Sequence, residues 1–119
     1  MKRILIIEDE PDVAESIKIF LEKAGYSVEY TLEGAKGIAM LKGFDLLLLD
    51  LIMPKLSGRG VLKEMKKQGI KKPVVVLSAV GLPQVVRTEL DREYPDVEFI
   101  TKSEMHSELV PAIKRALGE

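Results

Sequence analysis

Short apolar runs alternate with longer amphipathic stretches five times along this chain, and this alternation constrains its fold more than any other feature. The runs at residues 4–7, 46–49 and 74–77 are uninterrupted, whereas those at 26–30 and 97–100 are mixed. A short uninterrupted apolar run is typical of a strand that is buried on both faces of a sheet. The alternation therefore predicts an α/β fold, in which helices cover both faces of a parallel sheet.

The amphipathic stretches between these runs predict the helices. We expect helices over residues 12–24, 33–42, 60–67 and 105–117, and a further one between 80 and 96. Asp12 is assigned as the N-cap of the first helix and Gly25 as its stop signal. Pro83 is expected near the N-terminus of the helix between 80 and 96. Pro111 is expected either near the first turn of the last helix or at a kink in it.

The length and composition limit the possible classes of protein. A chain of 119 residues with 46% hydrophobic residues fits one folded domain, residues 1–119, with a sizeable core. The absence of cysteine excludes disulfides and thiolate catalysis. With 18 basic and 19 acidic residues the net charge is -1, so neither nucleic acid nor an anionic membrane is an expected partner.

The apolar runs are too short for targeting or membrane insertion. Only four apolar residues, 4–7, follow the basic N-terminus, which is too few for a signal peptide. No apolar stretch approaches the roughly 18 residues that a membrane helix needs. We therefore expect a cytoplasmic protein without a membrane partner.

Polar side chains follow four of the five expected strands. Glu8 and Asp9 follow the first, Asp50 the third, Ser78 the fourth and Lys102 the fifth. In an open parallel α/β sheet, ligands bind beyond the carboxyl ends of the strands, near the point where the strand order reverses. We therefore expect these five side chains to form one site.

The residue types at this edge favour a particular chemistry. Neighbouring carboxylates repel each other unless a cation lies between them. Oxygen ligands without a nearby histidine or cysteine suit Mg²⁺. A lysine and a hydroxyl suit phosphoryl oxygens. The sequence therefore predicts a site for a phosphoryl group held with Mg²⁺.

The sequence resembles the response-regulator receiver domain of two-component signalling over essentially its whole length. The matching segments are the acid pair Glu8-Asp9, Asp50-x-x-Met53-Pro54 with Gly58 beyond it, Ser78-Ala79 and Phe99-x-x-Lys102. Each segment alone is a weak signal, but all four in this order are specific. The resemblance implies a flavodoxin-like (βα)5 domain whose five parallel strands lie in the order 2-1-3-4-5.

The resemblance also implies a role for each site residue. Asp50 would accept a phosphoryl group from the phosphohistidine of a histidine kinase or a His-phosphotransfer protein. Ser78 and Lys102 would hold the phosphoryl oxygens. The implied Mg²⁺ ligands are Glu8 through water, Asp9, Asp50 and the backbone carbonyl of Ile52.

A conformational switch is the function that the resemblance implies. Ser78 would move toward the phosphoryl group and Phe99 would rotate inward. The surface of the fourth helix, fifth strand and fifth helix would then change its affinity for a downstream protein, which the sequence does not name. The chain ends soon after the last expected helix, so we expect either a stand-alone receiver or a trimmed one.

Two other functions stay open. The first is a degenerate receiver that acts only as a binding module; Ser103, where most receivers have proline after the lysine, keeps this alternative open. The second is a Mg²⁺-dependent phosphohydrolase with an aspartyl nucleophile, which would need a second aspartate where Ile52 stands. We expect no enzyme activity beyond self-phosphorylation and self-dephosphorylation.

Overall fold

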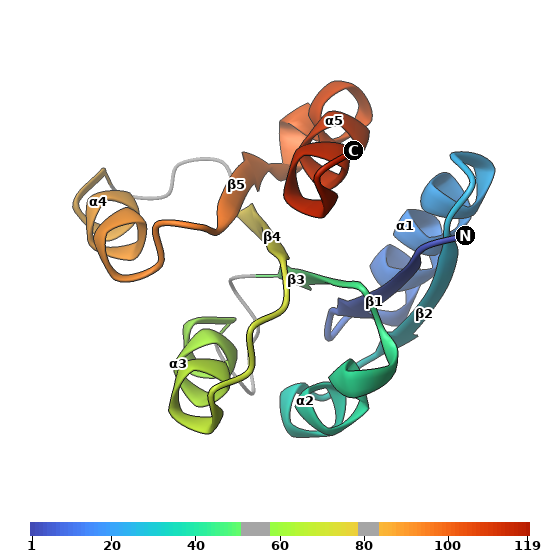
Figure 1. Cartoon of the computed structure of the whole chain (residues 1–119). Coiled ribbons are helices and arrows are strands. Elements are labelled where there is room, and N and C mark those ends of the chain that lie inside the picture. Colours follow the sequence, from blue (N-terminus) through green and yellow to red (C-terminus); the bar gives the residue numbers. More distant parts are fainter. Residues whose placement is uncertain (51–57, 79–83) are drawn as a thin grey trace.

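A five-stranded parallel sheet forms the centre of the molecule (Figure 1). The computed structural model describes residues 1–50, 58–78 and 84–119. The strand order is β2-β1-β3-β4-β5, which confirms the predicted order 2-1-3-4-5. The strands are β1 Arg3–Ile7, β2 Ser27–Thr31, β3 Leu46–Asp50, β4 Val74–Ser78 and β5 Glu98–Thr101.

Helices cover both faces of this sheet, as the alternating pattern predicts. The α-helices are α1 Pro11–Lys23, α2 Gly34–Met40, α3 Gly58–Gln68, α4 Gln84–Glu93 and α5 Met105–Leu117, and the short 3₁₀ helices are η1 Leu41–Gly43 and η2 Lys102–Glu104. Helices α1 and α5 cover one face, and α2 and α3 cover the other, with α4 beyond α3 (Figure 1). No helix in the described part of the chain has the length and apolar character needed to cross a membrane.

Side chains alternate between two cores along each central strand. Ile4 and Ile6 pack with Ile17 of α1 and Leu109 of α5, whereas Leu5 packs toward α2 and α3 in the other cluster. Successive side chains of a strand point to opposite faces of a sheet. The apolar runs are uninterrupted because both faces of the central strands are buried.

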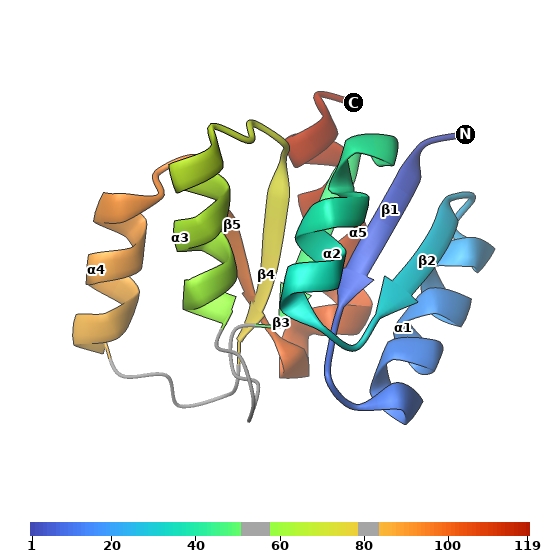
Figure 2. The same cartoon turned by 90° about the horizontal axis from the view of Figure 1, so that it is seen from below.

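The carboxyl ends of all five strands share one edge of the sheet (Figure 2). Strand β1 lies between β2 and β3, with Ile4 opposite Val28 on one side and Leu46 on the other. The chain runs outward from β1 in both directions, so the strand order reverses there. The N- and C-termini lie at the opposite end of the molecule (Figure 2).

The assignment of Asp12 as the N-cap of α1 is wrong. The N-cap is Glu10, whose backbone is extended, and Pro11 is the first helical residue. Proline is favoured at that position because its fixed φ suits the helix and its missing N–H is not needed there. Asp12 therefore lies inside the first turn, where its charge favours the helix dipole. The predicted stop is confirmed: Gly25 follows α1 with a φ of 99°.

The two other helix-proline expectations have different outcomes. Pro111 lies inside α5 and not in its first turn. Pro83 lies outside the described residues.

Gly37 lies where α2 packs closely against the sheet. A Cβ at this position would lie 2.6 Å from Ile7 Cγ1 and 3.1 Å from Thr31 Cγ2. We expect Gly37→Ala to lower the free energy of unfolding by about 1–3 kcal/mol, because overpacking outweighs the gain in helix propensity of about 1 kcal/mol. Urea unfolding measures the change.

Gly43→Ala is the matched control for this substitution. A Cβ at Gly43 would meet Arg3 Nη1 at 3.4 Å, an ordinary contact with a flexible side chain. We expect a change within about 0.5 kcal/mol. A stabilised Gly37→Ala protein would contradict the close approach of α2 to β1.

Candidate functional site

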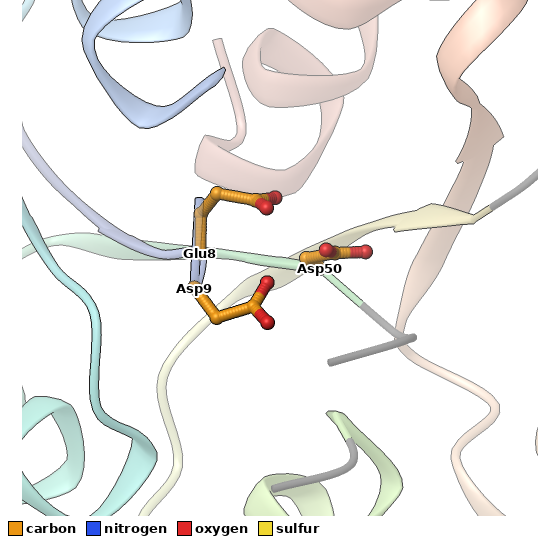
Figure 3. A group of neighbouring side chains, drawn as sticks. All are labelled: Glu8, Asp9 and Asp50. Atoms are coloured by element: carbon orange, nitrogen blue, oxygen red, sulfur yellow. The ribbon is translucent and has the colours of Figure 1, made fainter. Parts of the chain in front are cut away.

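Three carboxylates meet at the carboxyl edge of the sheet. Asp50 is the last residue of β3, and Glu8 and Asp9 directly follow β1. The two strands are parallel neighbours with Ile7 opposite Leu49, so their ends lie side by side. One oxygen from each carboxylate lies within 4.8 Å of the others, and Figure 3 shows the three groups pointing toward one another.

Two of these carboxylates are deeply buried. The exposed fraction is 1% for Glu8 and 4% for Asp50, while Asp9 is half-buried. Glu8 Oε1 accepts a hydrogen bond from the backbone N–H of Glu10 at 3.3 Å. Glu8 Oε2 is buried without a hydrogen-bond partner among the described residues. A buried polar atom without a partner is costly, so this oxygen is available for a ligand.

Lys102 brings one positive charge to the cluster from the far side of the sheet. It is the first residue of η2, directly after β5. Its Nζ lies 3.5 Å from Asp50 Oδ2 and 3.8 Å from Glu8 Oε2. The Lys102 side chain is 40% exposed, so it reaches the two buried acids from the solvent side. Among the residues that the structure describes, this is the one ammonium group that forms an ion pair with any of the three carboxylates.

The pKa of Glu8 reflects its burial and the charges around it. The pKa of Glu8 is raised from 4.5 to about 8, chiefly by burial and also by the hydrogen bond and charge repulsion with Asp50. The Lys102 charge and the Glu10 amide oppose this rise in pKa but do not cancel it. Without a further cation, the folded protein therefore favours a proton on Glu8.

This raised pKa predicts a pH dependence of stability. The unfolded chain releases the Glu8 proton near pH 4.5, whereas the folded chain keeps it to about pH 8. The folded state thus binds more protons between these values, and the Glu8 contribution to the free energy of unfolding falls as the pH rises through this window. Above about pH 8, in a chelating buffer, we expect the free energy of unfolding of Glu8→Gln to exceed that of the parent protein by on the order of a few kcal/mol. Urea unfolding measures the difference.

A divalent cation is the internal control for this prediction. Mg²⁺ between the carboxylates favours the ionised form of Glu8, so added Mg²⁺ should reduce or reverse the advantage of Glu8→Gln. An equal stability difference at all pH values, with and without Mg²⁺, would show that the acid cluster carries no such electrostatic strain.

The donor set fits Mg²⁺. Glu8, Asp9 and Asp50 form a group that could hold a metal ion, and all its donors are carboxylate oxygens. Hard oxygen ligands from one or two carboxylates, with water completing the shell, are what Mg²⁺ prefers. Glu8 Oε2, which has no hydrogen-bond partner among the described residues, belongs to one of these three carboxylates. The remaining predicted ligand, the backbone carbonyl of Ile52, lies outside the described residues.

The other predicted site residues lie on the strands next to β3. Ser78 is the last residue of β4, opposite Thr101 of β5, and so ends at the same edge as Asp50. Phe99 lies in β5, partly buried against the core on the α2 and α3 side of the sheet. Glu8, Asp9, Asp50, Ser78 and Lys102 thus lie at the end of a strand or directly after one, at the same edge of the sheet, whereas Phe99 lies within β5.

A turn around Lys102 was not anticipated from the sequence. Thr101 and Glu104 form a capping box that encloses η2. The described residues contain no cis peptide bond, so the bond between Lys102 and Ser103 is trans. The sequence does contain a signal for this turn, because a threonine followed three residues later by glutamate is the capping-box pattern.

Comparison with known proteins agrees with this geometry. Residues 4–114 match the family described as the response regulator receiver domain. The chain therefore belongs to the response-regulator receiver family of two-component systems. A receiver domain from Clostridium thermocellum has a similar structure, with a TM-score of 0.85 and 28% sequence identity over 99% of this chain and 95% of that one.

Two bacterial proteins are related in sequence. The transcriptional regulatory protein DltR of Streptococcus agalactiae is 37% identical over 114 residues, which cover 94% of this chain and 50% of DltR. The transcriptional regulatory protein YkoG of Bacillus subtilis is 38% identical over 119 residues, covering 98% of this chain and 51% of YkoG. The chain thus spans about half the length of these relatives, both of which are named as regulators of transcription.

Proposed function

We propose that this receiver domain is a phosphoacceptor switch, in which Asp50 takes a phosphoryl group from the phosphohistidine of a histidine kinase or a His-phosphotransfer protein. One observation carries the proposal: the buried Asp50 carboxylate lies between an acidic pair and a lysine at the carboxyl edge of the sheet. The family match over residues 4–114 supports the same function. The proposed domain extends over residues 1–119.

Asp50 is the nucleophile in this proposal. One of its carboxylate oxygens attacks the phosphorus, the P–N bond to the donor imidazole breaks, and the imidazole leaves with a proton. The product is an acyl phosphate on Asp50. Such a transfer depends mainly on positioning and charge neutralisation, which a few fixed side chains supply.

Mg²⁺ is the proposed cofactor. Asp9, Asp50 and the backbone carbonyl of Ile52 would bind it directly, and Glu8 through water. When bound, it neutralises the carboxylates and the phosphoryl oxygens. The raised pKa of Glu8 supports this assignment, because the charge of Lys102 does not offset the burial of Glu8 and its repulsion by Asp50.

The remaining residues would hold and read the phosphoryl group. The Lys102 ammonium would pair with a phosphoryl oxygen, since it already lies 3.5 Å from Asp50 Oδ2. The Ser78 hydroxyl would bind another oxygen, and Phe99 would turn inward as Ser78 moves. The surface of α4, β5 and α5 would then shift between two states with different affinity for a downstream protein.

The partners of the chain follow from this scheme. A histidine kinase or phosphotransfer protein would donate the phosphoryl group in the cytoplasm. DltR and YkoG are named as transcriptional regulators, and this chain matches only about half of each. We therefore assign no nucleic acid contact to the receiver domain itself, whose net charge is -1.

Acetyl phosphate is a direct probe of the proposal. The protein is incubated with acetyl phosphate, with and without Mg²⁺, and its intact mass is measured. We expect the mass of one phosphoryl group to appear only with Mg²⁺. Continuous release of phosphate from simple phosphate esters would instead favour the hydrolase. An unchanged mass in a folded protein would favour the binding module.

A further inference from the structure

Lys102 reaches the acid cluster from a short turn at the carboxyl edge of the sheet. It lies in a three-residue turn, η2, between the end of β5 and the start of α5. Lysine carries its ammonium group on a flexible stem of four carbons, and the Lys102 side chain is 40% exposed. Even so, its Nζ lies 3.5 Å from Asp50 Oδ2 and 3.8 Å from Glu8 Oε2. The geometry of the turn therefore decides where this ammonium group can lie.

Hydrogen bonds tie the two ends of this turn together. Glu104 Oε1 accepts one hydrogen bond from the Thr101 backbone N–H at 3.3 Å and another from Thr101 Oγ1 at 2.7 Å. Thr101 Oγ1 also lies 3.0 Å from Ser103 Oγ. Ser107 Oγ donates to the Glu104 carbonyl at 3.3 Å, which joins the turn to α5. The residues on either side of Lys102 are thus joined by a hydrogen bond between their side chains.

We propose that Thr101 and Glu104 are positioning residues that aim Lys102 at Asp50. The inference rests on the proposed role of Lys102 in phosphoryl transfer. The capping box fixes the backbone before and after Lys102, and α5 anchors it on the far side. Neither Thr101 nor Glu104 touches the reacting atoms; both act through the lysine. Small errors in the position of such a group are costly in rate.

Two pairs of substitutions separate the hydrogen bonds from other properties of these side chains. Glu104→Ala removes the acceptor, whereas Glu104→Gln keeps an oxygen that can complete a capping box. Thr101→Val removes the hydroxyl but keeps the branched shape that suits a strand, and Thr101→Ser keeps the hydroxyl. Glu108→Ala is the control for loss of negative charge, because Glu108 lies exposed in the first turn of α5.

The rate of phosphorylation by acetyl phosphate at saturating Mg²⁺ is the first readout. We expect Glu104→Ala and Thr101→Val to be about tenfold slower than the parent protein. Glu104→Gln, Thr101→Ser and Glu108→Ala should stay within about twofold. In a Lys102→Ala background, Glu104→Ala should have no further effect, because the two changes act through one group.

The reactivity of Lys102 is a second readout that does not require phosphorylation. An amine that lies 3.5 Å from Asp50 and 3.8 Å from Glu8 is covered on that side by the two carboxylates, whereas a lysine released from them is open to a reagent on all sides. We expect an amine-acylating reagent to modify Lys102 about threefold faster in Glu104→Ala than in Glu104→Gln, as measured by peptide mass spectrometry. Exposed lysines elsewhere on the protein provide the internal reference.

The outcomes separate this inference from the proposed function. If the parent protein is phosphorylated and Glu104→Ala is unchanged in rate and in Lys102 reactivity, the positioning role is wrong. Equal slowing of Glu104→Ala in the presence and absence of Lys102 would also overturn it, because the loss would then be general. If the parent protein takes no phosphoryl group, the proposed function fails, and the reactivity of Lys102 still decides whether the capping box aims it.

Discussion

Asp50→Asn is expected to abolish phosphorylation by acetyl phosphate and by a phosphohistidine donor. The amide that replaces the carboxylate has no charged oxygen to attack the phosphorus, and no acyl phosphate can form at this position. The variant should stay folded, because the change removes one negative charge from a group of three neighbouring carboxylates, two of which are buried. Intact mass after incubation with Mg²⁺ and acetyl phosphate measures the loss.

Asp12→Asn is the matched control for this substitution. Asp12 is an exposed aspartate in the first turn of α1, at the same end of the sheet as Asp50. Its replacement removes the same charge without touching the acid cluster, so phosphorylation should proceed at nearly the parent rate. Phosphorylation of Asp50→Asn at an undiminished rate would place the acceptor on another residue.

Lys102→Ala is expected to slow phosphorylation by about 10²–10³-fold, the cost of removing one charged donor from a preorganised site. Its ammonium group is the only cation found within 4.0 Å of Asp50 among the described side chains. The substitution also removes a charge that lowers the pKa of Glu8, so the variant should be less stable at high pH without Mg²⁺. Initial rates of mass gain and urea unfolding measure the two effects.

Lys114→Ala is the control for Lys102→Ala. Lys114 is an exposed lysine in the last turn of α5, far along that helix from η2. Its loss should leave the phosphorylation rate within about twofold of the parent value. If Lys102→Ala were equally fast, Lys102 would have only a structural role, and the inference about Thr101 and Glu104 would fall with it.

Most of the fold could be predicted because its signals are local. A run of four leucines ending in Asp50 is typical of a strand that is buried on both faces of a sheet. The glycine that ends α1 and the alternating elements were equally readable. The strand order, by contrast, came from the resemblance and not from any local pattern.

The start of α1 shows where local rules compete. Asp12 and Pro11 both favour a helix N-terminus, but at different positions. The proline at the first helical position prevails because it needs no hydrogen bond, and Asp12 is left inside the helix.

The site could be predicted in its residues but not in its energetics. Parallel strands bring their carboxyl ends to one edge, so Glu8, Asp9 and Asp50 had to approach one another. Their degree of burial depends on how the helices pack around them, which no motif records. For this reason the burial of Glu8 Oε2 and the raised pKa of Glu8 emerged only from the three-dimensional arrangement.

The position of Lys102 depends both on hydrogen bonds between neighbouring residues and on the pairing of strands far apart in the sequence. Ser103 indicated only that the usual proline was absent. The hydrogen bonds of Thr101 and Glu104 show what holds the turn in its place. Whether Lys102 then reaches Asp50 depends on the pairing of β4 with β3 and β5, which sequence spacing alone does not fix.

Reductive trapping of the acyl phosphate identifies the residue that accepts the phosphoryl group. The protein is phosphorylated with acetyl phosphate and Mg²⁺, then treated with borohydride, which reduces an aspartyl phosphate to homoserine. Peptide mass spectrometry locates the converted residue. If Asp50 is the acceptor, we expect homoserine at position 50 and nowhere else, and none without Mg²⁺. Conversion at Asp9 or another acid, with Asp50 unchanged, would contradict it.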